Sequence, residues 1–245
     1  MDNATRVDIT TDILSRMAEI CGEFSQTRKM LIRLGKSLLN GEARILVPVC
    51  PDYAHRDGKY TFDGLCGDIP LLAQKHIAFL RRLQVVCPTL NPQVLMLMAD
   101  HEADDPALVR TVRKSREEFL MLLNSSVEKM REAVVPMGWQ VEAMTKIIPS
   151  LVEDEERVYQ EICANPAYRG RIISDTIKRM GMYVKYGNLS PEEMEERTAR
   201  TSAQYVVLGR YAAHHGFMVC NHTTTNLSWY LQTEAAVLHN PVEIY

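Results

Sequence analysis

Two short segments of this 245-residue chain collect side chains that can act as acids, bases or nucleophiles. Segment 50–55 (Cys-Pro-Asp-Tyr-Ala-His) carries a thiol, a carboxylate, a phenol and an imidazole, and segment 100–105 (Asp-His-Glu-Ala-Asp-Asp) carries four carboxylates and an imidazole. Each follows a short apolar run, 44–50 or 94–99, that is typical of a buried strand. In open α/β sheets, ligands bind beyond the carboxyl ends of the strands. We therefore expect both segments to lie at one edge of a sheet and to face a ligand.

Four polar residues of these two segments are the predicted substrate contacts. They are Asp52, Tyr53, Asp100 and Glu102. The alternative is a solvated turn in which Asp104 or Asp105 caps a helix that begins at Pro106. Cys50 carries the chemistry of a nucleophile, although a cysteine that ends a strand is most often a small buried apolar residue.

The helix predicted after Pro106 carries a basic face. Arg110, Arg113 and Lys114 lie together by the i, i+3, i+4 rule, with Arg116 close to them. Four positive charges in seven residues could follow the phosphate backbone of a nucleic acid. The alternative is a solvated face whose charges pair with neighbouring glutamates.

The histidines crowd toward the end of the chain, together with one cysteine: His214, His215, Cys220, His222 and His239. No HExxH or zinc-finger spacing is present, so we expect no metal and no cofactor. His222 and Asn240 sit where short strands end and are predicted to form hydrogen bonds with a ligand. The chain also lacks GxGxxG, GxxxxGK(S/T) and GxSxG, which disfavours a conventional dinucleotide domain, a P-loop NTPase and an α/β-hydrolase.

The elements that position these residues follow from apolar spacing. Helices are predicted over 11–39, from Pro70 to before Pro88, from Pro106 to about Val134, and over most of 140–213. Strands are predicted over 44–50, 94–99, 217–220 and 235–239, with a long polar loop over 52–68. A strand, helix, strand unit implies parallel neighbours. The predicted fold is α/β: a Rossmann-like, mostly parallel sheet with a large helical component, forming one domain over 1–245 with a helical elaboration around 140–215.

The charge balance, the cysteines and the length of the apolar stretches limit the kind of protein this chain can be. The chain has 28 Lys and Arg against 31 Asp and Glu, so any nucleic-acid contact must be local. Six cysteines without a CxxC pair, and no basic-then-apolar leader, favour a cytoplasmic protein with reduced thiols. No apolar stretch approaches the roughly 20 residues that span a bilayer.

The order of these features resembles the tRNA-dependent cyclodipeptide synthases, whose Rossmann-like domain is similar to the catalytic domain of class I aminoacyl-tRNA synthetases. The resemblance is one of layout and covers most of the chain. It includes the strand and turn over 47–53, the helix over 71–83, the strand that ends at Asp100, the basic helix, the region 159–171, the helix with Tyr205 and the strand that ends in His239-Asn240-Pro241.

In that family, a serine after the first strand accepts the aminoacyl group, a Tyr-x-x-x-Glu pair holds its amino group, and a basic helix takes the tRNA. The resemblance therefore implies a transferase for an activated amino acid delivered as aminoacyl-tRNA. Tyr205 would match the tyrosine, and Cys50 would replace the serine as the acyl acceptor. Gly209 stands where the family has its glutamate.

Two other functions stay open. A second resemblance, to isonitrile synthases of the tyrosine and tryptophan type, rests on Pro51-Asp52 and on Asp100, and implies an enzyme that acts on a free amino acid. The missing serine and glutamate favour a non-catalytic protein of the same fold that binds a nucleotide or another small ligand. Salt-sensitive tRNA binding would separate the transferase from both alternatives.

Overall fold

A computed structural model describes residues 43–49, 53–56, 59–62, 71–86, 91–105, 115–182, 189–222 and 228–240. Its centre is a five-stranded sheet in which all paired strands run parallel. The strand order is β5 (Gln140–Ala143), β4 (Gln93–Met98), β1 (Arg44–Val49), β6 (Met218–His222), β7 (Val237–Asn240). This confirms the predicted parallel α/β sheet. The helix predicted over 11–39 lies outside the described residues.

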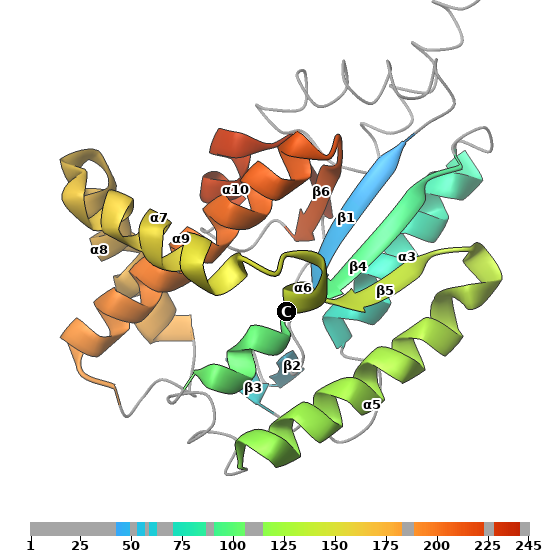
Figure 1. Cartoon of the computed structure of the whole chain (residues 1–245), viewed down its shortest axis with the longest axis horizontal. Helices are drawn as coiled ribbons and strands as arrows, with labels where there is room; N and C mark the ends of the chain where they lie inside the picture. Colours follow the sequence, from blue (N-terminus) through green and yellow to red (C-terminus); the bar gives the residue numbers. More distant parts are fainter. Residues whose placement is uncertain are drawn as a thin grey trace, which may run out of the picture.

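Helices cover both faces of the sheet (Figure 1). One face packs against α3 (Leu71–Val86) and α5 (Arg116–Val134). The other packs against α6 (Met144–Ile147), α7 (Leu151–Ala164), α8 (Pro166–Met182), α9 (Pro191–His214) and α10 (Ser228–Glu234). Because successive side chains of a strand point to opposite faces, Ile45 and Val47 enter the first core and Leu46 enters the second. Strands buried on both faces explain the continuous apolar runs in the sequence.

Capping residues set where two long helices begin. Ser115 has extended backbone angles, φ −68° and ψ 162°, and forms a reciprocal capping box with Glu118 at the start of α5. The single continuous helix predicted from Pro106 to Val134 is therefore wrong, because Ser115 itself is extended and α5 begins only after it. Ser190 and Glu193 form the same box at the start of α9. Gly216, with φ 72°, follows α9 and turns the chain into β6.

Three predicted boundaries need correction. The loop predicted over 52–68 contains an antiparallel hairpin of β2 (Tyr53–Arg56) and β3 (Lys59–Phe62), and Asp57-Gly58 between them is a dipeptide typical of tight hairpins. The first residues of the predicted helical region form β5 instead, because they pair with the outer side of β4. The predicted loop between the last two strands contains α10.

Two short 3-10 helices complete the described elements: η1 (Asp100–Asp104), which follows β4, and η2 (Val135–Met137), which follows α5. In the part of the chain that the structure describes, no helix is both long and apolar enough to cross a membrane.

Candidate functional site

The two segments with acid, base and nucleophile chemistry follow neighbouring strands. Val49 and Met98 are register partners at the carboxyl ends of β1 and β4, and the Ala99 amide donates to the Val49 carbonyl at 3.0 Å. Cys50 and Asp52 lie outside the described residues. Tyr53 is the first residue of β2.

Asp100 holds two elements together. One carboxylate oxygen accepts from the Thr145 amide at 3.0 Å, and the other accepts from the Thr145 hydroxyl. Asp100 thereby ties the end of β4 to the start of α6. The residue predicted as a substrate contact is thus engaged in a structural bond, and Glu102, half-buried on the same turn, is not among the residues that line the cavity described below.

Two other predicted residues lie side by side in the sheet. His222 and Asn240 are register partners at the carboxyl ends of β6 and β7. The order of the strands reverses between β1 and β6, which is the switch point where open α/β sheets often bind ligands.

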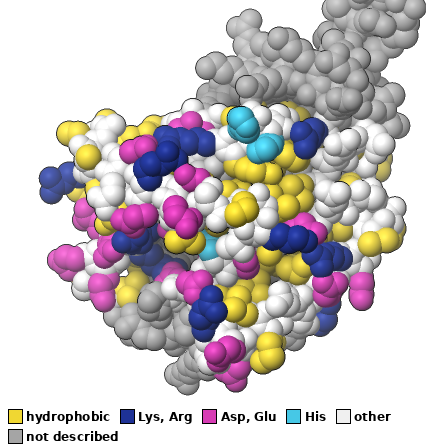
Figure 2. Space-filling model, viewed as in Figure 1, with side chains coloured by type: hydrophobic (Ala, Val, Ile, Leu, Met, Phe, Trp, Pro, Cys, Tyr) yellow, Lys and Arg dark blue, Asp and Glu magenta, His cyan; other side chains and the backbone are white. Residues whose placement is uncertain are grey.

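A cavity of about 580 Å³ lies beside the carboxyl end of β4. It opens between η1, the first half of α7 and residues 193–204 of α9. Acidic and basic side chains are intermixed on the face of the molecule shown in Figure 2. The cavity is lined by His101, Asp104, Asp105, Val152, Glu155, Glu156, Leu189, Glu193, Glu196, Arg197, Arg200, Thr201 and Gln204.

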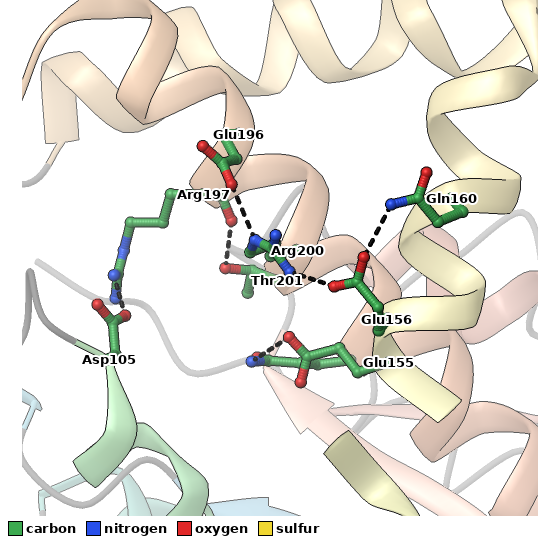
Figure 3. A network of polar contacts seen from close by, with 9 residues as sticks. Asp105, Glu155, Glu156, Gln160, Glu196, Arg197, Arg200 and Thr201 are labelled. Atoms are coloured by element: carbon green, nitrogen blue, oxygen red, sulfur yellow. Dashed lines mark hydrogen bonds and ion pairs between the residues drawn. The ribbon is translucent and has the colours of Figure 1, made fainter. Parts of the chain in front are cut away.

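Two arginines of α9 pair with three of the cavity's carboxylates (Figure 3). Arg197 reaches across to Asp105 in an ion pair that is largely shielded from solvent. Arg200 bonds to Glu156 at 2.8 Å and to Glu196 at 3.1 Å. The Arg200 guanidinium also lies 4.2 Å from the centre of the Tyr159 ring. These contacts join η1, α7 and α9 around the cavity.

Two further carboxylates of the cavity are also engaged. Asp104 pairs with Arg116, whose hydrogen bond is the main cause of the lowered pKa of Asp104. Glu193 accepts from the Ser190 amide at 2.7 Å as part of the helix cap.

Glu155 differs from these carboxylates. Among the described residues its hydrogen-bond partner is a neutral amide, the Gln204 side chain, at 3.3 Å. Burial raises the pKa of the Glu155 carboxyl, and the charges of His101 and Arg200 act in the opposite direction. The residue was not predicted, although the sequence contains a signal for it. Leu151, Glu155, Val158 and Ile162 share one face of α7, and the three apolar members are buried.

His101 lines the same cavity from η1. Both of its ring nitrogens are buried, and neither has a hydrogen-bond partner among the described residues. An unpartnered buried polar group costs about 1–3 kcal/mol, so a polar ligand group that bonded to the imidazole would recover that cost. The sequence places His101 in the acidic segment, but its role was not predicted.

Tyr205 follows the cavity residue Gln204 on α9 and packs, half-buried, against the second core. Gly209, four residues later, faces α10. A Cβ at this position would lie 2.9 Å from Glu234 Cβ and 3.3 Å from the Leu231 carbonyl oxygen. The glutamate of the Tyr-x-x-x-Glu pattern would therefore collide with α10.

The predicted tRNA-binding face is described only at Arg116, which pairs with Asp104. Arg110, Arg113 and Lys114 lie outside the described residues. Within the described ranges, no three histidine, cysteine or acidic side chains gather into a group that could hold a metal ion.

No protein-family model matches the chain, and no curated protein matches it. Among solved structures it is similar to the tryptophanyl-tRNA synthetase of Plasmodium falciparum, with a TM-score of 0.50 and 10% identity over 98% of this chain and 65% of that chain. It is also similar to the tyrosyl-tRNA synthetase of Leishmania major, with a TM-score of 0.49 and 11% identity over 92% of this chain and 37% of that chain. The PvcA protein of Pseudomonas aeruginosa has a TM-score of 0.46 and 13% identity over 95% of this chain and 83% of that chain.

The chain thus spans less than two thirds of either synthetase chain. At this identity the likeness to the tryptophanyl enzyme concerns the fold. The Rossmann-like α/β fold predicted from the sequence, and its similarity in layout to class I aminoacyl-tRNA synthetases, are confirmed.

Proposed function

We propose that the chain is a transferase that acts on an aminoacyl group delivered by tRNA, and that Glu155 holds the ammonium of that group. The observation that carries the proposal is the position of Glu155: a carboxylate in a cavity beside the sheet's carboxyl edge, bonded to a neutral amide while neighbouring carboxylates have arginine partners. The synthetase-like fold supports an aminoacyl ligand by analogy alone.

An ammonium group fits this arrangement electrostatically. A charge-assisted hydrogen bond contributes about 1.5–3 kcal/mol, and an entering cation would offset the desolvation of the Glu155 carboxylate. Val152 and Leu189 add apolar surface to the same cavity, which suits the side chain of an amino acid. The residue that would hold the amino group is then on α7, in place of the glutamate that Gly209 replaces on α9.

Further residues, some of them outside the described ranges, complete the proposal. Cys50 would attack the ester carbonyl of aminoacyl-tRNA, forming a thioester while the tRNA 3′ oxygen leaves with the thiol proton. Arg110, Arg113, Lys114 and Arg116 would contact the tRNA backbone. Asp52, Tyr53, His222 and Asn240 remain proposed substrate contacts from the strand ends, and Tyr205 a proposed catalytic residue.

The test compares three forms of the same tRNA: aminoacylated, N-acetyl-aminoacylated and deacylated. We expect the wild-type protein to prefer the free ammonium form, and Glu155→Gln to reduce that preference by about 10- to 100-fold, the equivalent of one charge-assisted bond. Glu153→Gln, on the exposed side of α7, is the matched control and should keep the preference. Equal wild-type affinity for all three tRNA forms would contradict the proposal.

A non-catalytic small-ligand protein is the second candidate. Two contacts favour it. Gly209 packs against α10 where the resembling family has its glutamate, and Asp100, a predicted substrate contact, is bonded to Thr145 instead. Binding of a small amino-acid ester without binding of any tRNA form would favour this function.

A further inference from the structure

A second cavity, of about 460 Å³, lies at the opposite end of β4 from the one that Glu155 lines. Its described lining includes Arg44, Gln93 and Gln140, which begin three neighbouring strands, and Phe217, just before β6. Arg44 and Gln93 are register partners on β1 and β4. The size suits a small organic ligand, since such sites measure about 300–1,000 Å³.

Arg44 brings a positive charge to this cavity. No acidic side chain is among the residues that line the cavity in the described part of the chain. Most arginines of the described residues pair with a carboxylate, as Arg116 and Arg210 do. Arg44 instead donates to the His215 carbonyl oxygen, and its guanidinium lies 4.1 Å from the centre of the Phe217 ring. These contacts hold the guanidinium in place and leave most of its five N–H donors for a ligand.

A second arginine lies at the rim of the cavity. Arg81 on α3 donates from Nε to the Met137 sulfur at 3.2 Å, and Met137 lines the cavity. A thioether is a weak, uncharged acceptor, so this contact leaves the Arg81 charge unbalanced. Like Arg44, Arg81 has no carboxylate partner among the described residues. The cavity and its rim therefore attract an anion, although the chain as a whole has a net charge of −3.

The cavity also offers neutral hydrogen-bonding groups. Asn91, Gln93 and Gln140 each end in an amide that both donates and accepts, and none of these side chains bonds to another described residue. The edges of nucleobases present the same mixture of donors and acceptors. An arginine fork matches the oxygens of a phosphate.

We propose that this cavity binds a nucleotide, with its phosphate on Arg44 and its base on the side-chain amides. A nucleotide supplies both the anion and the hydrogen-bonding edge that the lining residues fit. Two sources present this chemistry, a free mononucleotide and an unpaired nucleotide of an RNA chain. The site does not depend on the proposed function, which uses the carboxyl edge of the sheet.

The test is isothermal titration calorimetry of the full chain with the four ribonucleoside 5′-monophosphates, their nucleosides and inorganic phosphate. We expect at least one monophosphate to bind more tightly than its nucleoside and than inorganic phosphate. Arg44→Gln should weaken that binding by about 10- to 100-fold, the equivalent of one charge-assisted bond. Arg81→Gln should weaken it by about 2- to 5-fold, as a rim charge does. Arg82→Gln, exposed at the next position of α3, is the matched control and should keep the wild-type affinity.

A short single-stranded RNA distinguishes the two sources. Equal losses of RNA and monophosphate affinity in Arg44→Gln would assign the nucleotide to an RNA chain. Unchanged RNA affinity beside a weakened monophosphate would assign it to a free mononucleotide. Arg81→Gln, on the helix surface, provides the comparison if loss of the Phe217 contact unfolds Arg44→Gln.

Three results would overturn the proposal. The first is a nucleoside, or inorganic phosphate, that binds as tightly as the monophosphate. The second is wild-type affinity in both Arg44→Gln and Arg81→Gln. The third is no binding of any nucleotide, free or in RNA.

Discussion

Glu155 occupies a position where a charged side chain costs stability. It lies on the apolar stripe of α7, between Leu151 and Val158, where an aliphatic residue would add to the core. Its described hydrogen bond comes from Gln204, which does not neutralise its charge. A half-buried carboxylate whose described hydrogen-bond partner is neutral is typical of a site whose ligand supplies the opposite charge.

Replacing Glu155 with glutamine should stabilise the free protein at neutral pH. Because burial raises the folded-state pKa of Glu155, the charged carboxylate penalises the folded state above that pKa, and the penalty fades as pH falls toward the unfolded value. We expect Glu155→Gln to raise the free energy of unfolding at pH 7 by about 0.5–2 kcal/mol. The gain should shrink as the pH is lowered to about 4.5, measured by urea unfolding across pH.

Glu153→Gln is the control for this comparison. Glu153 is exposed in the first turn of α7, where a carboxylate interacts favourably with the helix dipole. Its replacement should therefore cost about 0.3–1 kcal/mol, the opposite sign. A Glu155→Gln protein that is less stable than wild type at pH 7 would show that the carboxylate is a structural group.

Among the secondary-structure elements, α9 both lines the cavity and packs against a neighbouring helix. Residues 193–204 include the side chains that line the cavity, among them Arg197, Arg200 and Gln204, and the helix also packs against α10. Gly209 lies after the cavity-lining residues, where Glu234 and Leu231 approach too closely for a Cβ. The absence of a glutamate four residues after Tyr205 thus follows from helix packing.

The close contact of Gly209 with α10 predicts opposite effects on stability for two glycine replacements. Gly209→Ala gains about 1 kcal/mol of helix propensity but forces apart two packed helices, which costs about 1–3 kcal/mol. We expect it to lower the free energy of unfolding by up to about 2 kcal/mol. Gly170→Ala on α8, where a Cβ would meet nothing within 4 Å, should stabilise by up to about 1 kcal/mol. Equal gains from both, in the same urea experiment, would contradict the close α9–α10 contact.

For the molecule as a whole, the net negative charge limits where a nucleic acid could bind. The formal net charge is −3, so the proposed tRNA binding would depend on a local basic surface that works against the overall field. The sequence offers the basic face around Arg110, Arg113 and Lys114. Arg116 is a weaker member, since it already pairs with Asp104.

Neutralising that face should change the salt dependence of tRNA binding. Replacing Arg110, Arg113 and Lys114 with glutamine removes three phosphate partners, so the slope of log affinity against log salt should become shallower by about 2–3. A control protein with Arg82→Gln and Lys129→Gln, which are exposed on α3 and α5, should keep the wild-type slope. Identical slopes for all three proteins would place the tRNA elsewhere or exclude its binding.

The strands in the interior of the sheet, and the helices that cover them, could be predicted from residue order alone. β1 and β4 are continuous apolar runs because both of their faces are buried, and the capping pair Ser190 and Glu193 is local in the chain. Burial and capping depend on residue type and short spacing, which a sequence displays directly.

The meeting of distant polar groups depends instead on how the elements pack. Asp100 bonds to Thr145, and Glu155 to Gln204, across 45 and 49 residues of chain. β5 is a strand because β4 offers it hydrogen bonds, and Gly209 leaves the room that α10 occupies. Spacing along the chain encodes which side chains are buried, but it does not encode which distant partner each one finds. The cavity that His101 and Glu155 both line therefore exists only once the helices are placed on the sheet.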